Sequence, residues 1–225
     1  MKILAVSDEE RAIIYQPAIC SRFSDIGLII SCGDLPYYYL EYIISMLDKP
    51  LYFVRGNHAP RIEFGEAGER SHPWGGINLH RRCIRDRSGL LLAGIEGCMT
   101  YNYGPQQYSD VQMWTMVWAL APRLLWNKLR NGRFVDIFVT HAAPWKIHDK
   151  DDRAHRGVKA FRWVIDVFKP AYLLHGHIHV YRQDTVTETV VRQTRVINVF
   201  GYREIEIDPV TGGAVAPSAA PEKKP

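Results

Sequence analysis

The sequence repeats one local pattern, a short apolar run that in most cases ends in Asp, Asn or His. The runs are rich in Ile, Leu, Val and aromatic residues and are bounded by Gly, Asp or Asn, which is typical of buried β-strands. They predict strands at residues 2–6, 28–31, 51–54, 90–95, 135–139 and 172–174. These runs constrain the fold more than any other feature of the chain.

Segments with helical spacing separate the first strands. Residues 39–47 place Leu40, Ile43, Ile44 and Leu47 on one face of a helix. The alternation of strands with such segments predicts an α/β fold in which helices cover a parallel sheet.

Two further helical segments lie in the second half of the chain. The first starts at Ser109 or Asp110, either of which can cap a helix, and ends near Arg130 before an Asn-Gly stop signal. The second covers residues 158–168 and ends before Pro170. The first helix carries three tryptophans, which we expect in the core or at a partner surface.

The C-terminal part of the chain alternates Thr and Val, which predicts strands near residues 186–191, 196–200 and 203–207. We expect these strands to be antiparallel and to complete a second sheet. Residues 209–225 are rich in Pro, Ala and Gly and show no hydrophobic periodicity. They are expected to form a disordered tail after one domain at residues 1–208.

Composition and charge exclude several classes of protein. With 225 residues, 47% of them hydrophobic, the chain is globular and can fold without disulfides or a structural metal. Its net charge of +4 is small for a dedicated DNA-binding protein, so nucleic acid is expected only as a substrate. The four cysteines lack CxxC spacing, and the apolar runs are too short for a membrane span or a signal peptide. We therefore expect a cytoplasmic protein with free cysteines.

Side chains that can bind a ligand follow five of the expected strands at the point where each strand ends. In an open α/β sheet the carboxyl ends of the strands line one crevice, and ligands bind there. Glycine directly precedes three of these residues, which lets the backbone turn sharply near a crowded centre. The residues at the strand ends are Asp8, Asp34, Asn57, His58, His141, His177 and His179.

This set of oxygen and nitrogen ligands is suited to Mn, Fe, Zn, Ni or Co. It is large enough for two cations, with the Asp34 carboxylate as the natural bridge. Two metal ions roughly 3.5–4 Å apart can bind both the attacking and the departing oxygen of a phosphoryl displacement. A single Asp or His at a strand end is more often a helix cap, and Gly-Asp pairs are common in turns. The conjunction of five such ends favours a metal site.

The same residues form an ordered motif series. It consists of Asp8, Gly33-Asp34, Gly56-Asn57-His58, His141 and Gly176-His177-Ile178-His179. The series resembles the motifs of the calcineurin-like metallophosphoesterases, over about residues 2–180. The resemblance implies an α/β fold arranged as a four-layer α-β-β-α sandwich with two mixed sheets. It also implies a dinuclear metal site with a metal-bound hydroxide as nucleophile.

The resemblance further implies a role for each motif residue. Asp8, Asp34 and His179 would hold one metal, and Asp34, Asn57, His141 and His177 would hold the other. His58 would be the catalytic histidine, which stabilises or protonates the leaving oxygen.

The sequence departs from this family pattern at three positions. The first motif is usually Asp-x-His, but position 10 is Glu, so the first metal would take the Glu10 carboxylate or have one protein ligand fewer. A carboxylate in place of imidazole favours harder ions such as Mn or Mg over Zn. Tyr37 stands where many members carry an acid. Ala59 follows His58 where an acid would fix the histidine tautomer.

Two segments beside the motifs are candidates for substrate binding. The aromatic run that contains Tyr37 could stack on a nucleobase, although packing of loops onto the scaffold is the more common role of such residues. The polar loop that contains His155 and Arg156 follows the His141 strand. It could hold the non-reacting part of a substrate or be a solvated connection.

Together these features predict a metal-dependent phosphoesterase that acts on phosphodiesters or phosphomonoesters, with diesters favoured by the altered first motif. Two divalent cations are expected, Mn first, with Fe, Zn, Ni or Mg as alternatives. The expected partner is a small-molecule or nucleotide phosphoester and not a membrane, and the oligomeric state stays open. The alternative is a binding or scaffold protein that keeps the fold but has lost efficient catalysis, which the missing histidine at position 10 would support.

Overall fold

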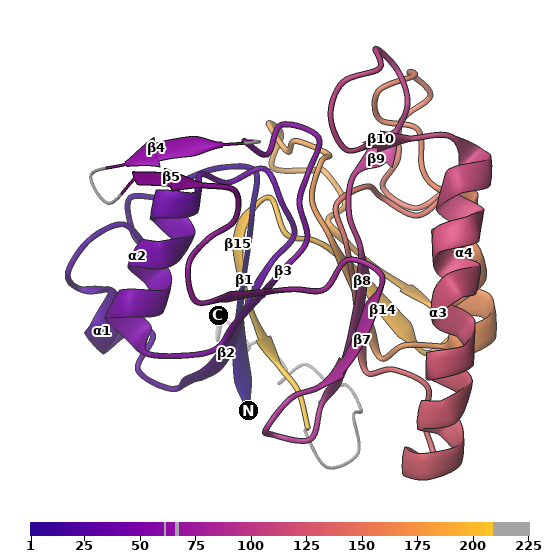
Figure 1. Ribbon diagram of the computed structural model, residues 1–225, viewed down its shortest axis with the longest axis horizontal. Coiled ribbons are helices and arrows are strands. Elements are labelled where there is room, and N and C mark those ends of the chain that lie inside the picture. The colour runs from indigo at the N-terminus through magenta and orange to yellow at the C-terminus, as the bar shows by residue number, and fades with distance from the viewer. Residues whose placement is uncertain (61, 66–67, 209–225) are drawn as a thin grey trace, which may run out of the picture.

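Two β-sheets pack face to face, and helices cover the outer face of each sheet (Figure 1). The computed structural model describes residues 1–60, 62–65 and 68–208. Helices α1 (Ile19–Arg22) and α2 (Tyr37–Leu47) lie on one side of the sheets, and α3 (Asp110–Asn131) and α4 (Lys159–Phe168) lie on the other. This arrangement confirms the predicted four-layer α-β-β-α sandwich.

The first sheet has the strand order β15-β1-β2-β3-β6. Four strands run parallel, and β15 is antiparallel to its neighbour β1. The bounds are β1 Lys2–Ser7, β2 Ile26–Ser31, β3 Leu51–Phe53, β6 Gly76–Asn78 and β15 Gly201–Glu206.

The second sheet has the strand order β13-β14-β12-β11-β8-β7. Its four central strands run parallel, and the two edge strands are antiparallel to their neighbours. The bounds are β7 Arg82–Arg85, β8 Leu91–Ile95, β11 Ile137–Thr140, β12 Tyr172–His175, β13 Glu188–Val191 and β14 Thr194–Asn198. Two small two-stranded sheets pair β4 (Glu63–Gly65) with β5 (Gly68–Arg70) and β9 (Cys98–Met99) with β10 (Gln107–Tyr108).

Three layers of buried apolar side chains hold these four layers together. One lies between the first sheet and α1 and α2, where Ile43 is fully buried. The second lies between the sheets and includes Ile30 and Val139, and the third joins the second sheet to α3 and α4 through Val117 and Phe161. Each central strand is thus apolar on both faces, which explains why the strands appear in the sequence as continuous apolar runs.

Helix α3 begins and ends where the sequence predicts. The side chain of Ser109 accepts a hydrogen bond from the backbone N–H of Gln112, and the Gln112 side chain accepts one from the N–H of Ser109. This reciprocal pair is a capping box. The helix ends at Gly132, whose φ of 75° lies in the left-handed region that favours glycine.

Helix α2 is capped by a residue distant in sequence. Glu63 of β4 accepts hydrogen bonds from the backbone N–H groups of Tyr37 at 2.6 Å and Tyr38 at 2.9 Å. A carboxylate at this end complements the positive pole of the helix dipole. The contact ties the β4–β5 pair to the start of α2, above which it lies in Figure 1.

One strand lies in a different sheet from the one predicted. The sequence predicts three antiparallel strands in the second sheet, but only β13 and β14 belong to it, and β14 runs parallel to β12. Instead β15 pairs with β1, with Lys2 opposite Glu206. This part of the prediction is wrong. Ile205 and Ile207 pack into the layer between the sheets, and a strand of either sheet can place apolar residues there, so the apolar pattern does not identify the sheet.

Other expectations concern the cysteines, the helices and the tail. All four cysteines are free. Among the described residues, no helix combines the length and the apolar character needed to cross a membrane. The predicted tail at residues 209–225 lies outside the described residues and stays a prediction.

Candidate metal centre

Four predicted ligands meet at the carboxyl ends of strands β2, β3, β11 and β12. The Nε2 atom of His141 lies 3.1 Å from Oδ2 of Asp34, from Oδ1 of Asn57 and from Nδ1 of His177. The ligand atoms of Asp34, His141 and His177 all lie within 4.8 Å of one another. Three atoms with lone pairs around a single imidazole nitrogen form the kind of donor cluster that a divalent cation occupies.

Backbone carbonyls set the orientation of both imidazoles. The carbonyl oxygen of Cys32 lies 2.9 Å from Nδ1 of His141, and that of Ala154 lies 2.7 Å from Nε2 of His177. A carbonyl can only accept, so each of these nitrogens carries a hydrogen. The opposite nitrogen of each neutral ring is therefore free to bind a metal through its lone pair, and it is this nitrogen that faces the cluster.

The electrostatics of the cluster also fit a cation. Burial alone would lower the pKa of His141, but the carboxylates of Asp34 and Asp8 outweigh it and raise the pKa to about 9. Burial, followed by the charge on His141, lowers the pKa of His177 to about 3. In the metal-free cluster His141 is therefore the imidazole that takes up an additional proton, beside the Asp34 carboxylate. A metal ion would replace this proton with a larger positive charge.

Three of the predicted ligands adopt left-handed backbone conformations. The φ angles are 62° at Asp8, 54° at Asp34 and 67° at His177. Such angles are uncommon outside glycine and cluster at functional sites, where the surrounding fold enforces them. Each of these residues lies within three positions of the end of its strand.

Glycines leave the space that the ligands occupy. A Cβ atom on Gly56 would lie 2.0 Å from Oδ1 of Asp34, and one on Gly176 would lie 2.4 Å from Oδ2 of Asp8. Neither glycine has a positive φ, so glycine is needed at these positions because the nearby carboxylates leave no room for a Cβ atom.

The first predicted metal subsite is more open than the second. The Asp8 side chain is fully buried, and its two oxygens accept hydrogen bonds from the backbone N–H of His177 at 3.0 and 3.1 Å. Nε2 of the exposed His179 lies 3.8 Å from Oδ1 of Asp8. A hollow of about 420 Å³ opens here, lined by both residues together with Arg11 and Phe200.

Glu10 points to a different partner. Its Oε2 accepts a 2.7 Å hydrogen bond from the hydroxyl of Tyr38, and this bond, with burial, raises the Tyr38 pKa to about 12. Glu10 is exposed and does not belong to the convergent group of Asp34, His141 and His177. The structure therefore does not bring Glu10 into the cluster, and its role as a ligand stays a prediction.

His58 lies at the rim of the cluster. Its backbone N–H donates a 2.8 Å hydrogen bond to Oδ1 of Asp34, while the residue as a whole is exposed. The Asp34 carboxylate is thus held on one oxygen by this N–H and faces His141 with the other. Ala59, in the position of the missing acid, is buried.

The predicted substrate residues have different surroundings. Tyr37 is only 2% exposed, and its hydroxyl donates to the carbonyl of Pro60 at 2.6 Å, which fixes the segment after His58. The ring of His155 lies 5.3 Å from that of His177, and its Nδ1 contacts Asp152 at 2.9 Å. Arg156 is exposed. The loop is therefore close to the ligands, whereas Tyr37 is part of the scaffold; substrate binding by any of the three stays a prediction.

Several residues that orient the ligands escape the sequence analysis. The hydroxyl of Tyr101 accepts a 3.1 Å hydrogen bond from Nδ2 of Asn57, which turns the amide oxygen toward His141. His148 and His175 form a second pair, with 2.9 Å between their ring nitrogens, next to Gly176. Tyr101 stands outside the motif series, and a carbonyl such as that of Cys32 leaves no signal in a sequence.

Comparison with known proteins agrees with this geometry. Residues 16–181, more than half of the chain, match the model of the calcineurin-like phosphoesterases. This range contains every ligand of the convergent cluster, whereas Asp8 and Glu10 precede it. No curated protein matches the chain significantly.

Solved structures share the fold at low sequence identity. One crystal structure superposes with a TM-score of 0.58 and 12% identity, over 91% of this chain and 94% of the other. The crystal structure of TT1561 of Thermus thermophilus gives a TM-score of 0.55 and 16% identity, over 89% of each chain. At these identities the likeness shows the fold alone.

Proposed function

The chain belongs to the calcineurin-like phosphoesterase family, and we propose that it is a dinuclear metal-dependent hydrolase of phosphodiesters or phosphomonoesters. The observation that carries this proposal is the convergence of Asp34, Asn57 and His177 on Nε2 of His141, beside Gly56, whose lack of a Cβ leaves room for the Asp34 carboxylate.

The residues present fit two cations. Asp34, Asn57, His141 and His177 would hold one, and Asp8, Asp34 and His179 would hold the other, with Asp34 between them. Divalent cations in such a site neutralise charge on the phosphoryl group and lower the pKa of the attacking water. Manganese is the first candidate, because the oxygen donors Asp8, Asp34 and Asn57 suit a harder ion than the thiolate-rich sites that select zinc.

The chain's own groups would supply the remaining functions. The exposed His58 imidazole, anchored through its backbone N–H to Asp34, would protonate the leaving oxygen. Arg156 and His155, on the loop that contacts His177 through Ala154, would bind the non-reacting part of the substrate. Diesters, including those of nucleotides, are the preferred class. The free cysteines fit a reducing compartment such as the cytoplasm.

A second function is supported by the surroundings of Glu10. If the Tyr38 hydroxyl retains this carboxylate, the first subsite has one protein ligand fewer. The chain would then be a weakened family member that serves as a binding or scaffold protein.

Metal analysis and an activity panel distinguish the two functions. We expect up to two transition-metal ions per chain after Mn addition, and hydrolysis of at least one compound among phosphomonoesters, linear diesters and cyclic nucleotides. Asp34→Asn should lose most of the metal and nearly all activity. Asp184→Asn is the matched control, because Asp184 is exposed and forms an ion pair with its near neighbour Arg182. Bound metal without turnover would favour the scaffold function, and folded protein that binds no metal would exclude both metal subsites.

A further inference from the structure

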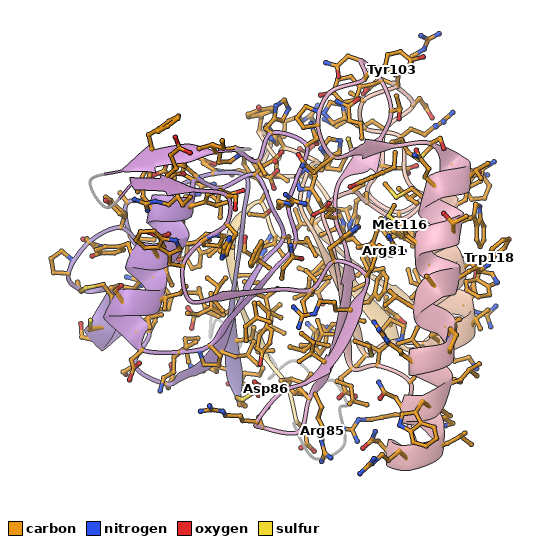
Figure 2. All side chains as sticks on the ribbon, viewed as in Figure 1. Arg81, Arg85, Asp86, Tyr103, Met116 and Trp118 are labelled. Carbon is orange, nitrogen blue, oxygen red and sulfur yellow. The ribbon has the colours of Figure 1, made fainter. Side chains whose placement is uncertain are left out.

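Helix α3 carries a second apolar face that points away from the core. Its inner face is buried through Met113, Val117, Leu120 and Leu124. The outer face, here called the α3 stripe, consists of Val111, Thr115, Trp118, Pro122, Leu125 and Leu129. Val111 is 71% exposed, Trp118 57%, Leu125 53% and Leu129 81%. Figure 2 shows Trp118 directed outward from the helix.

The spacing of the stripe is regular. Successive members are separated by four, three, four, three and four residues. This is the 3.5-residue repeat by which one helix packs along another. A helix that only covered its own sheet would not need this repeat on its outer face, since the apolar residues of its inner face already pack against the core.

Tryptophans make the stripe rigid near its middle. The ring of Trp118 lies 5.7 Å from that of Trp114, which lies 5.7 Å from Trp163 of α4. Trp126, beside the stripe, is 60% exposed. Tryptophans held in this way and still open to solvent are the residues that most often dominate the energy of a protein interface.

The stripe is complementary to itself when one copy is reversed. Its members lie symmetrically about position 120, so reversal places Val111 opposite Leu129, Thr115 opposite Leu125 and Trp118 opposite Pro122. A two-fold contact needs this self-complementarity, because each surface meets its own copy.

The charges of α3 also select the reversed orientation. The only acidic residue is Asp110 in the first turn, while Arg123, Lys128 and Arg130 lie in the second half. Parallel pairing would bring the basic ends together and align the helix dipoles. Antiparallel pairing brings the acidic start of one helix to the basic end of the other and opposes the dipoles.

From this register and charge pattern we infer that the α3 stripe is the contact surface of a homodimer in which two copies of α3 pack antiparallel about residue 120. The 22-residue helix is about 33 Å long, and a contact roughly 10 Å wide covers about 330 Å² per copy. This is below the roughly 800 Å² per partner of a standard interface. The dimer is therefore weak and depends on protein concentration.

Sedimentation velocity of the full chain between about 1 and 200 μM tests the inference. The sedimentation coefficient should rise with concentration in the wild type. Trp118→Glu should raise the dimer dissociation constant at least tenfold. The matched control is Tyr103→Glu, which changes an aromatic residue that is 92% exposed in a loop outside α3 and should leave the dimer intact.

Cysteine crosslinking tests the register. In a Cys20→Ser background, Thr115→Cys combined with Leu125→Cys should give a disulfide-linked dimer under mild oxidation, because positions 115 and 125 of the two copies face each other. Thr115→Cys alone should not, since its two copies would lie about 15 Å apart, beyond the reach of a disulfide. Efficient crosslinking of the single variant would indicate parallel pairing and overturn the inferred register.

Two other outcomes would overturn the dimer itself. One is a wild-type chain that remains monomeric at 200 μM. The other is a monomer that co-sediments with vesicles of phosphatidylcholine and phosphatidylserine in a Trp118-dependent manner, which would make the α3 stripe a lipid-binding face. Both outcomes are independent of hydrolytic activity.

Discussion

Substitution of Gly56 by alanine tests how closely the fold confines the predicted metal ligands. The added Cβ would lie 2.0 Å from Oδ1 of Asp34 and 2.7 Å from Cε1 of His141, whereas ordinary contacts begin near 3.4 Å. The Asp34 carboxylate would therefore have to move by about 1.4 Å. Ligand distances in a metal site tolerate only about ±0.2 Å, so the geometry of the cluster should be lost.

The expected result is a large loss of metal affinity with a moderate loss of stability. Displacing a residue that merely orients a ligand costs about 10- to 100-fold in affinity, so moving Asp34 itself should cost at least 100-fold. Overpacking should reduce the free energy of unfolding by about 1–3 kcal/mol. For a chain of this size that lowers the melting temperature by roughly 2–12 °C, and the variant should still fold.

Isothermal titration of metal-free protein with Mn, together with a thermal unfolding scan, measures both quantities. Gly104→Ala is the matched control, because its Cβ would meet only the ends of the Gln107 and Asn102 side chains, which can move aside. If Gly56→Ala binds Mn as tightly as the wild type, the cluster around His141 is not the metal site.

Three further predictions follow from individual contacts. His58→Ala should keep the metal, because alanine retains the N–H that binds Asp34, but lower turnover about 100-fold, as measured by metal analysis and steady-state kinetics. Glu96→Ala should lower the free energy of unfolding in urea by about 2–3 kcal/mol, because the buried Glu96 carboxylate pairs with Arg55 at 2.8 Å and accepts a hydrogen bond from Tyr108; an unchanged midpoint would contradict this. The metal-free protein should be most stable near pH 6.5 in urea titrations. Burial lowers the pKa of His148 to about 4 and of His175 to about 3, so the free energy of unfolding should decrease as the pH falls and these rings must be protonated. The pKa of His141 is raised to about 9, so the stabilisation from its charged form should be lost as the pH rises through that value. A free energy of unfolding that does not change with pH would contradict both predictions.

The part of the site that could be predicted from the sequence is the part encoded at strand ends. Asp34, Asn57, His141 and His177 each follow a run of apolar residues, and parallel strands necessarily bring those ends to one edge. The helix limits were predictable for a similar local reason, since Ser109 and Gly132 act on their nearest neighbours.

The rest depends on contacts between residues that are distant in the chain. Alternation of apolar residues shows that Ile205 is buried, but both sheets cover the same layer, so the pattern does not say which sheet it joins. The hydroxyl of Tyr38 binds Glu10 across 28 positions, a pairing that residue types alone do not reveal. The orientations of the His141 and His177 rings are fixed by the backbone carbonyls of Cys32 and Ala154, and a backbone contact cannot be inferred from the residue type.

The Glu63 cap on α2 has a consequence for how phosphate can be recognised. In many α/β proteins the exposed N–H groups at the start of a helix bind phosphate. Here the Glu63 carboxylate already binds the backbone N–H groups of Tyr37 and Tyr38, and it places a negative charge at this site. This internal anion would compete with any phosphate for the start of α2. Under the proposed function, the positive surroundings of a phosphoester would therefore come mainly from cations at the strand ends. Phosphate retention by this protein should therefore fall together with its metal content.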